Sequence, residues 1–394
     1  MRTCSTAMAG LASARTSPLR LPDELVLMVM EWCGRLPYER RRPLARLCRL
    51  AKRYTGPAQR LLYQKVAVGG DVDVEGTVEH TLLHQPRLRL LVKSVEYCRE
   101  GRGLLPLGLV TLLCDLPNVA EVSWSSLFDV EPPRLLFAQR GIRLRQISAP
   151  SWGAELASLA ATYPDAFSSL EHVEVGNIGI DDDFAFPLPA FLPRLRKLGV
   201  GMFRSERDFE VLAGHLQHQL VSLSLPLDWE LDGISLTGMS ELRHLRLTVQ
   251  ADIEREDVGR IVLAVLGVLD SARAVGALTS LSIERGTCLL GLAPSPDIAS
   301  REPVPSFCSL LFAIPPQIEH LSLDTDCFLA SDVAAFLLGP LRPSRLCTLR
   351  IADTVGRGLT EILGDSMGPC GALADTLERA GVEVTTVDWR AIYS

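Results

Sequence analysis

The sequence predicts an α/β solenoid, in which short strands alternate with helices, preceded by a small helical head. Two observations predict this fold class. An apolar pattern, L-x-x-L-x-L with substitutions, recurs through most of the 394 residues, and a short arginine-rich segment of different character precedes it. Hydrophobic residues make up 47% of the chain and aromatic residues only 6%, so aliphatic side chains are expected to fill the core. We expect a disordered tail over residues 1–20, the helical head over 21–65 and the solenoid over 66–394.

The apolar pattern has the spacing of a structural repeat. The first seven matches begin 22 to 27 residues apart, and wider gaps before Leu278 and Ile318 indicate insertions. A period of roughly 20–29 residues is typical of leucine-rich repeats, so we expect a leucine-rich-repeat solenoid (horseshoe) of about ten irregular repeats. The matches begin at Val92, Val119, Leu144, Leu170, Leu195, Leu220, Leu242, Leu278, Ile318 and Leu346.

Each repeat predicts one strand with two kinds of side chain. Alternate apolar residues point into the core, and the residues between them point to the concave face. We expect the concave face to hold a protein target, because the residues predicted there are mixed in charge. The charged and histidine candidates are Glu174, Lys197, His244, Arg246, His320, Asp324 and Arg350, with Ser222, Ser224, Ser282, Glu284 and Ser322 on the same face.

The end of the chain is expected to cap the solenoid. Residues Val382–Val387 alternate in polarity and predict a last strand, after a helical stretch over Leu359–Ala380. A cap is needed because an open repeat edge exposes apolar side chains and unpaired strand groups. We expect Trp389 to pack in this cap; the alternative is a residue that anchors the target.

Residues 21–65 have the pattern of short helices. Pro22 suits the first turn of a helix, and Asp23 and Glu24 favour its positive N-terminus. Apolar residues then recur at three- and four-residue steps, which predicts one helical face. That face is Leu25, Met28, Val29 and Trp32; a second helix is expected over Leu44–Leu50, a turn at Gly56-Pro57 and a third short helix over Ala58–Tyr63.

The same segment resembles an F-box, in the form common in fungal F-box proteins. The resemblance is carried by Leu21-Pro22-x-Glu24-Leu25, by Leu44-x-x-Leu47-Cys48-Arg49-Leu50-x-Lys52-Arg53-Tyr54 and by Leu61-Leu62-Tyr63. It implies the substrate-recognition subunit of an SCF-type E3 ubiquitin ligase, whose head docks on the Skp adaptor of a cullin-based ligase. The adaptor-binding residues it implies are Leu21, Pro22, Leu25, Val29, Leu44 and Leu47. The alternatives are a helical cap on the solenoid and a leucine-rich-repeat interaction scaffold without a ligase role.

Charge changes where the head ends. Residues 1–65 contain 13 Lys or Arg and 4 Asp or Glu, whereas the remainder contains 27 and 43. The positive head suits an acidic partner, and an arginine-rich helix face in solvent gives the same balance. The positive charge has neither aromatic interleaving nor zinc spacing, so no nucleic-acid partner is expected.

We expect no catalysis, metal or cofactor in this chain. His215-x-x-His218 has no third ligand nearby in sequence, and Asp181–Asp183 lacks the spacing of a calcium loop. Gly199-Val-Gly201 lacks the third glycine of a dinucleotide-binding loop, and no G-x-S-x-G occurs. An α/β enzyme is the alternative from another class, and it needs a convergent polar site.

The cysteines and apolar runs bear on location. The 10 cysteines stand singly, without a C-x-x-C pair, which indicates reduced thiols and predicts a cytoplasmic or nuclear protein. The longest apolar run, Ile261–Leu269, is far shorter than the roughly 20 residues of a membrane span, so no membrane partner is expected. Residues 1–20 contain Arg, Ser and Thr without acids, a composition shared by disordered tails and mitochondrial transit peptides.

Overall fold

The computed structural model of the protein divides into two compact units, Met1–Val66 and Ala67–Ser394. The structure describes residues 23–35, 46, 52–69, 77–97, 107–124, 134–138, 141–149, 155–178, 192–203, 206–227, 234–250, 258–286, 308–324, 328, 330–352 and 382–387.

In the first unit, α1 (Asp23–Arg35) packs against α3 (Lys52–Gln64). Met30 and Cys33 of α1 and Ala58 of α3 are buried at the centre of this contact. The partly buried residues around them are Val26, Tyr54, Leu61 and Leu62.

The predicted turn at Gly56-Pro57 is wrong, because α3 continues through both residues. A proline inside a helix removes a backbone hydrogen bond and disfavours the helix by about 3 kcal/mol. Packing offsets this cost. Tyr54, Ala58 and Leu61 follow at four- and three-residue steps, and a continuous helix keeps all three in the contact with α1. The predicted helix over Ala58–Tyr63 is therefore the second half of a longer one.

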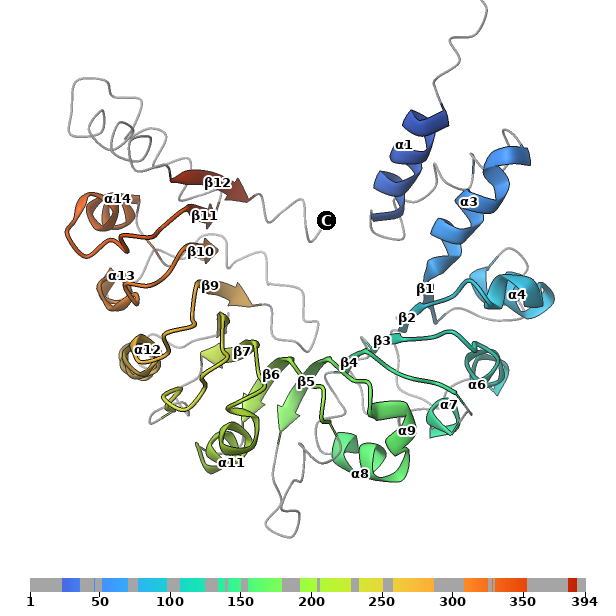
Figure 1. Cartoon of the computed structure of the whole chain (residues 1–394), viewed down its shortest axis with the longest axis horizontal. Helices are drawn as coiled ribbons and strands as arrows, with labels where there is room; N and C mark the ends of the chain where they lie inside the picture. The colour runs from blue at the N-terminus through green and yellow to red at the C-terminus, as the bar shows by residue number, and fades with distance from the viewer. Residues whose placement is uncertain are drawn as a thin grey trace, which may run out of the picture. The chain divides into compact units, whose positions relative to one another are not determined.

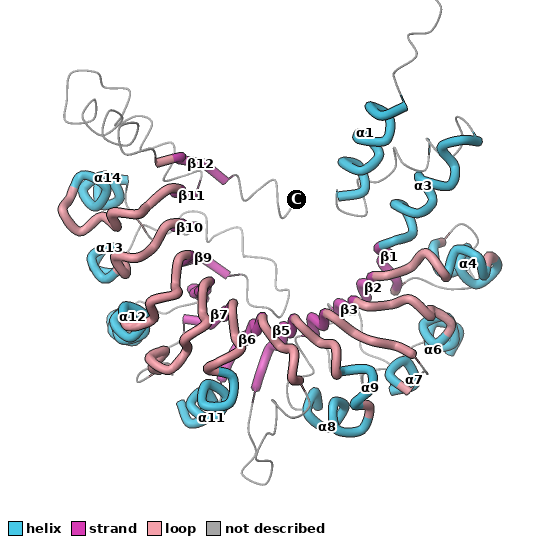
Figure 2. Tube along the Cα trace, in the orientation of Figure 1, coloured by secondary structure: helices cyan, strands magenta, loops and turns pink. Residues whose placement is uncertain are grey.

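The second unit is built on one sheet, whose first strand already begins in the last two residues of the first unit (Figure 1, Figure 2). Twelve strands pair in chain order, and every neighbouring pair from β2 to β12 is parallel. The strands are β1 (Lys65–Val68), β2 (Ser94–Tyr97), β3 (Glu121–Trp124), β4 (Gln146–Ala149), β5 (His172–Ile178), β6 (Lys197–Phe203), β7 (Ser222–Leu227), β8 (His244–Gln250), β9 (Ser280–Gly286), β10 (His320–Asp324), β11 (Thr348–Ala352) and β12 (Glu383–Val387).

Helices connect the strands and lie along the outer side of the sheet (Figure 1, Figure 2). They are α4 (Val78–His84), α5 (Pro86–Arg89), α6 (Leu107–Cys114), α7 (Arg134–Phe137), α8 (Glu155–Thr162), α9 (Pro164–Phe167), α11 (Glu206–Leu216), α12 (Val258–Arg273), α13 (Cys308–Ala313) and α14 (Ala330–Leu338). None of the helices in the described residues is both long and apolar enough to cross a membrane.

Aliphatic side chains form continuous buried rows from strand to strand. Leu281 on β9 is in register with Leu245 on β8 and Leu321 on β10, and each is at most 2% exposed. The first residue of the sequence match, such as Leu278, precedes the strand and is also buried. The repeat needs all three apolar positions because each one packs in the shared core between strands and helices.

The predicted α/β leucine-rich-repeat solenoid is confirmed. Each of the ten sequence matches ends in one of the strands β2–β11. The predicted last strand is present as β12, which pairs with β11 and extends the sheet. The helix expected over Leu359–Ala380 and the cap residue Trp389 lie outside the described residues.

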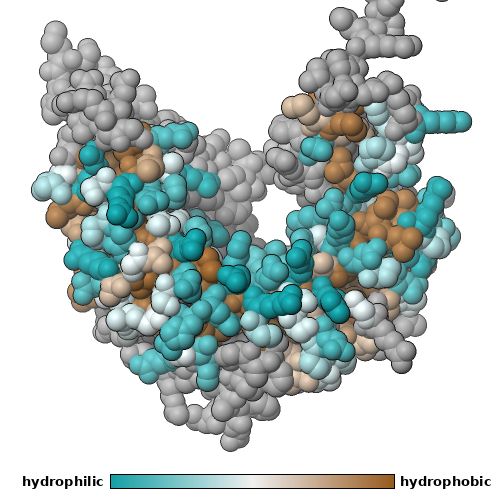
Figure 3. Space-filling model, in the orientation of Figure 1, coloured by the Kyte–Doolittle hydropathy of each residue, from teal (hydrophilic) through white to brown (hydrophobic). Residues whose placement is uncertain are grey.

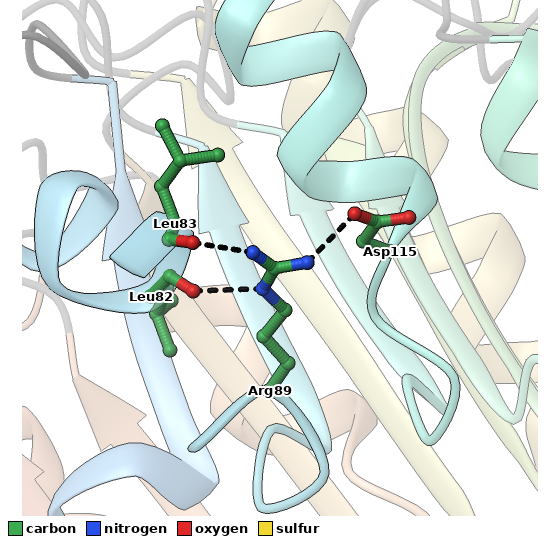
Figure 4. A network of polar contacts seen from close by, with 4 residues as sticks. All are labelled: Leu82, Leu83, Arg89 and Asp115. Carbon is green, nitrogen blue, oxygen red and sulfur yellow. Dashed lines mark hydrogen bonds and ion pairs between the residues drawn. The ribbon is translucent and has the colours of Figure 1, made fainter. Parts of the chain in front are cut away.

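Arg89 joins two neighbouring repeats (Figure 4). Its Nε and Nη2 donate to the carbonyl oxygens of Leu82 and Leu83 at 2.7 and 2.5 Å, and its Nη1 donates to the Asp115 carboxylate at 2.7 Å. These two carbonyls belong to the last turn of α4, where helical carbonyls lack partners within the helix. Asp115 follows α6, so the Arg89 guanidinium caps α4 and also links it to the C-terminal end of α6.

Candidate protein-binding face

Two rows of side chains across the sheet form a polar surface, called here the strand face. The parallel register aligns the first residue of each strand in one row and the third residue in the other. Hydrophilic side chains gather along this strand-lined side (Figure 3). The first row is Ser94, Glu121, Gln146, His172, Lys197, Ser222, His244, Ser280, His320, Thr348 and Glu383. The second is Glu96, Ser123, Ser148, Glu174, Gly199, Ser224, Arg246, Ser282, Ser322, Arg350 and Thr385.

The register brings most of the predicted target-binding residues into these two rows. Asp324, the last residue of β10, is in register with Glu284 on β9, and its side chain lies outside the described part of the structure. The predicted residues within the rows are Glu174, Lys197, His244, Arg246, His320 and Arg350.

Glu284 is buried, although strand alternation places it on the strand face. Its side chain is 12% exposed and forms an ion pair with Arg246 of the neighbouring strand β8. The Ser282 hydroxyl donates to Glu284 Oε1 at 2.6 Å. A carboxylate withdrawn from water requires such partners. Arg246 is therefore already engaged within the protein.

Glu174 extends toward the neighbouring strand β6. A Cβ atom added to its register partner Gly199 would lie 3.0 Å from Glu174 Cγ, so the glycine leaves room for this side chain. Gly199 thus has a packing role in the middle of a strand.

A histidine on the same strand controls the ionisation of Glu174. Glu174 Oε1 lies 3.2 Å from His172 Nε2. The hydrogen bond from His172 holds the pKa of the Glu174 carboxyl below its ordinary value, against the opposing effect of burial. The Ser148 hydroxyl and the charge of Arg246 lower this pKa further.

Lys197, His244 and His320 form a group of basic side chains in the first row, called here the basic cluster. All three residues are exposed. Burial, followed by the positive charges of Lys197, His320 and Arg243, holds the pKa of His244 below its ordinary value. The positive charges of Lys197, His320 and Arg243 therefore disfavour the protonated form of the His244 ring.

The charged residues of the strand face are distributed unevenly along the sheet. The acidic residues of the two rows between β2 and β5 are Glu96, Glu121 and Glu174, whereas the charged residues between β6 and β11 are Lys197, Arg246 and Arg350. Glu383 on β12 follows in the first row, and Arg246 is already paired with Glu284, so a partner that spans the face meets acidic residues first and then a mixture of basic and acidic groups.

In the head, α1 has a second apolar face that α3 does not cover. Met28 is 63% exposed and Val29 is 51% exposed, whereas Met30 is fully buried. Val29, a predicted adaptor-binding residue, is thus exposed, and Leu25 lies in the same helix. The other predicted adaptor-binding residues, Leu21, Pro22, Leu44 and Leu47, lie outside the described residues.

The structure describes the remaining motifs only in part. His215 and His218 are exposed near the C-terminal end of α11. Throughout the described part of the chain, no three His, Cys, Asp or Glu side chains are placed to hold a metal. Asp181–Asp183 lies outside that part.

Several polar residues of the strand face were missed in the sequence, and two of them contact a predicted residue. His172 and Ser148 both contact Glu174, and neither was among the candidates. The signal was present, because both stand at the alternate, non-core positions of their strands.

Comparison with known proteins finds only distant structural similarity. No family model and no curated protein matches the chain. The crystal structure of the leucine-rich-repeat-containing protein LegL7 from Legionella pneumophila is 14% identical, has a TM-score of 0.41, and the match covers 83% of this chain and 91% of that one. The structure of human 5T4 (trophoblast glycoprotein) is 17% identical, has a TM-score of 0.30, and the match covers 59% and 87%. Functional reasoning therefore depends on the residues of this chain.

Proposed function

We propose that this chain is the substrate-recognition subunit of an SCF-type E3 ubiquitin ligase. The head docks on a Skp adaptor that links it to a cullin, and the strand face holds a protein target. The chain performs no chemistry itself; it raises the effective concentration of the target at the ligase. Its place of action is the cytoplasm, the nucleus or both.

The observation that carries this proposal is the exposed apolar face of α1. A helix with one apolar face needs one packing partner. In the head, α3 already covers the face of α1 that contains Met30 and Cys33. Met28 and Val29 add a second apolar surface in water. Grouped apolar side chains at a surface mark interaction sites. The F-box resemblance of the same segment supports the Skp adaptor as the occupant.

The strand face supports the second half of the proposal. A solenoid places one set of side chains per repeat on a continuous surface, which suits extended protein partners. Here the set is polar, register-aligned and mixed in charge. Such a surface selects partners by charge complementarity and orients them along the sheet.

The double substitution Met28→Asp/Val29→Asp tests the docking of the head. Two carboxylates would enter an apolar contact that excludes water, so the affinity for the purified Skp adaptor should fall by about 30-fold or more, the ~2 kcal/mol of an interface hot spot. Biolayer interferometry on the full-length chain measures this affinity. Thermal melting should be unchanged, because both side chains are exposed.

Leu263→Asp is the matched control for this experiment. Leu263 is an aliphatic residue on α12 that is 67% exposed, but it lies in the solenoid. Adaptor binding by this variant should equal that of the wild type. Undiminished binding by the head variant would refute the proposed docking surface. A wild-type chain that captures its target but never binds the adaptor would instead be an interaction scaffold without a ligase role.

A further inference from the structure

The geometry points to an acidic, extended segment of the target protein as the ligand of the basic cluster. Asp or Glu carboxylates of that segment would lie against Lys197, His244 and His320. The inference rests on the proposed role of the strand face as the target-binding surface, and it adds the chemistry and the spacing of what is bound.

The spacing comes from the register of the sheet. Lys197, His244 and His320 stand on β6, β8 and β10, and the first-row positions on the two strands between them are Ser222 and Ser280. Adjacent strands lie about 4.8 Å apart, so consecutive basic residues are roughly 9.5 Å apart. A polyproline II segment repeats every third residue over about 9.3 Å. An acidic residue at every third position therefore matches the cluster.

The negative charge expected of the ligand follows because, within the described residues, the basic cluster has no acidic partners. In the described residues, none of the three basic side chains forms an ion pair, and the groups that shift the pKa of His244 are cations and burial. Two acidic residues of the face that the structure describes are engaged elsewhere, Glu284 with Arg246 and Glu174 with His172. A carboxylate of the partner would supply the missing countercharge.

Small serine side chains allow the backbone of the bound segment to come close to the strand face. Ser222 and Ser280 are partly buried, and between the longer basic side chains they leave shallow positions across which a backbone can pass. His320 Nδ1 lies 2.8 Å from Thr348 Oγ1, which orients its ring. A preoriented ring and a floor of small side chains reduce the ordering that binding requires.

Binding of such a segment should tighten as the pH falls. The groups around His244 are Lys197 on β6, Ser222 on β7, Ser280 on β9, His320 on β10 and Arg243 before β8, and none is acidic. These surroundings favour neutral His244 in the unbound protein, whereas a bound carboxylate favours the charged ring. Complex formation therefore takes up protons, and acidification through and below the ordinary histidine pKa of about 6.5 strengthens it.

Fluorescence anisotropy with two labelled peptides of equal composition tests the inference on the full-length chain. One peptide of about 12 residues repeats Glu-Pro-Ala, which gives polyproline II spacing, and the other has all its Glu residues adjacent. At pH 6 and low salt we expect the spaced peptide to bind about tenfold more tightly, because it engages all three basic residues. Equal binding of the two peptides, or a preference for the clustered one, would overturn the spacing argument.

The variant Lys197→Gln/His244→Gln/His320→Gln should bind the spaced peptide at least about tenfold more weakly. The matched control Arg134→Gln/His215→Gln/His218→Gln removes the same number of basic groups from exposed positions outside the strand face and should stay within about twofold of the wild type. Equal losses in the two variants would overturn the inference. So would single-stranded DNA that binds through the same three residues as tightly as the peptide.

Adaptor binding separates this inference from the proposed function. The cluster variant should bind the Skp adaptor like the wild type, because its substitutions lie in the solenoid. A captured target that cross-links to the strand face, but is not displaced by the spaced peptide, would refute the acidic ligand and leave the target-binding role of the face in place.

Discussion

Leu281 in the solenoid and Met28 in the head are both apolar residues of regular elements, yet one is fully buried and the other is 63% exposed. Leu281 is covered because β8 and β10 carry leucine at the same register position, Leu245 and Leu321. In the head, α3 covers one face of α1, through Met30 and Cys33. Register-aligned strands of a repeat array cover one another's core residues, whereas α3 leaves part of the apolar surface of α1 uncovered.

The largest expected effect tests this contrast directly. Leu281→Ala would leave a cavity between Leu245 and Leu321 and should lower the free energy of unfolding by about 2–5 kcal/mol. Met28→Ala should change that free energy by at most ~0.5 kcal/mol, because the side chain already lies in water. Urea denaturation of the two full-length variants measures both values. Equal destabilisation would break the comparison.

The same contrast applies to charged groups of the strand face. Arg246→Met would leave the Glu284 carboxylate buried without its counter-ion, which should cost about 1–3 kcal/mol; the 52% exposure of Arg246 keeps the cost below that of a fully buried pair. Arg246→Met/Glu284→Gln should recover a large part of this loss, because an amide tolerates the site better than a lone carboxylate. Denaturation midpoints of both variants provide the measurement, and strictly additive losses would show that the pair is not coupled.

Leucine spacing was sufficient to predict the strands, for a physical reason. A strand that must bury residues such as Leu281 and Ile283 against both neighbours accepts few alternative registers, so the pattern determines which residues face the core. The prediction was wrong at Gly56-Pro57, where a local rule about turns competed with the burial of Ala58 against α1. Tertiary packing of this kind is not encoded in any short window of sequence.

The sequence predicted which residues lie on the strand face, but not which of their side chains contact one another. Alternation alone placed Arg246 and Glu284 on one side of the sheet. The ion pair between them depends on the alignment of β8 with β9, whose residues are separated by the long helix α12. The same holds for the contact of Glu174 with the space above Gly199. Such contacts depend both on the side-chain conformation of each residue and on which residue of the neighbouring strand lies beside it.

A smaller effect on stability is expected from replacing arginine by lysine at a buried position, Arg89, and at an exposed one, Arg145. Arg89 is 14% exposed and bonds two carbonyls and Asp115 (Figure 4), whereas Arg145 is 68% exposed and lies 3.7 Å from Glu171. Arg89→Lys cannot reproduce the planar fork and should cost about 1–2 kcal/mol. Arg145→Lys should cost less than ~0.5 kcal/mol. Thermal melting distinguishes them, and similar shifts for both would mean that burial does not set the value of these contacts.

The smallest expected effect concerns a single proton on the half-exposed carboxyl of Glu174. The hydrogen bond from His172 is the main cause of its lowered pKa, and burial is the main opposing cause. His172→Gln removes the hydrogen bond to a chargeable ring but keeps the burial, so the pKa of Glu174 should rise. Carboxyl carbon NMR titration of the two proteins measures this directly. His215→Gln on α11, an exposed histidine outside the strand face, should leave the Glu174 titration unchanged.

The sign of the accompanying stability change follows from linkage. A carboxyl whose pKa is lowered by folding stabilises the folded state above the pKa of the unfolded chain, and this contribution is lost as the pH falls through the lower, folded pKa. His172→Gln should therefore be slightly less stable than the wild type near neutral pH, and the gap should close as acid protonates Glu174 in both proteins. Because Glu174 is 37% exposed, solvent screening keeps the gap small. A gap that widens on acidification, or a Glu174 pKa that does not move, would show that His172 does not control this carboxyl.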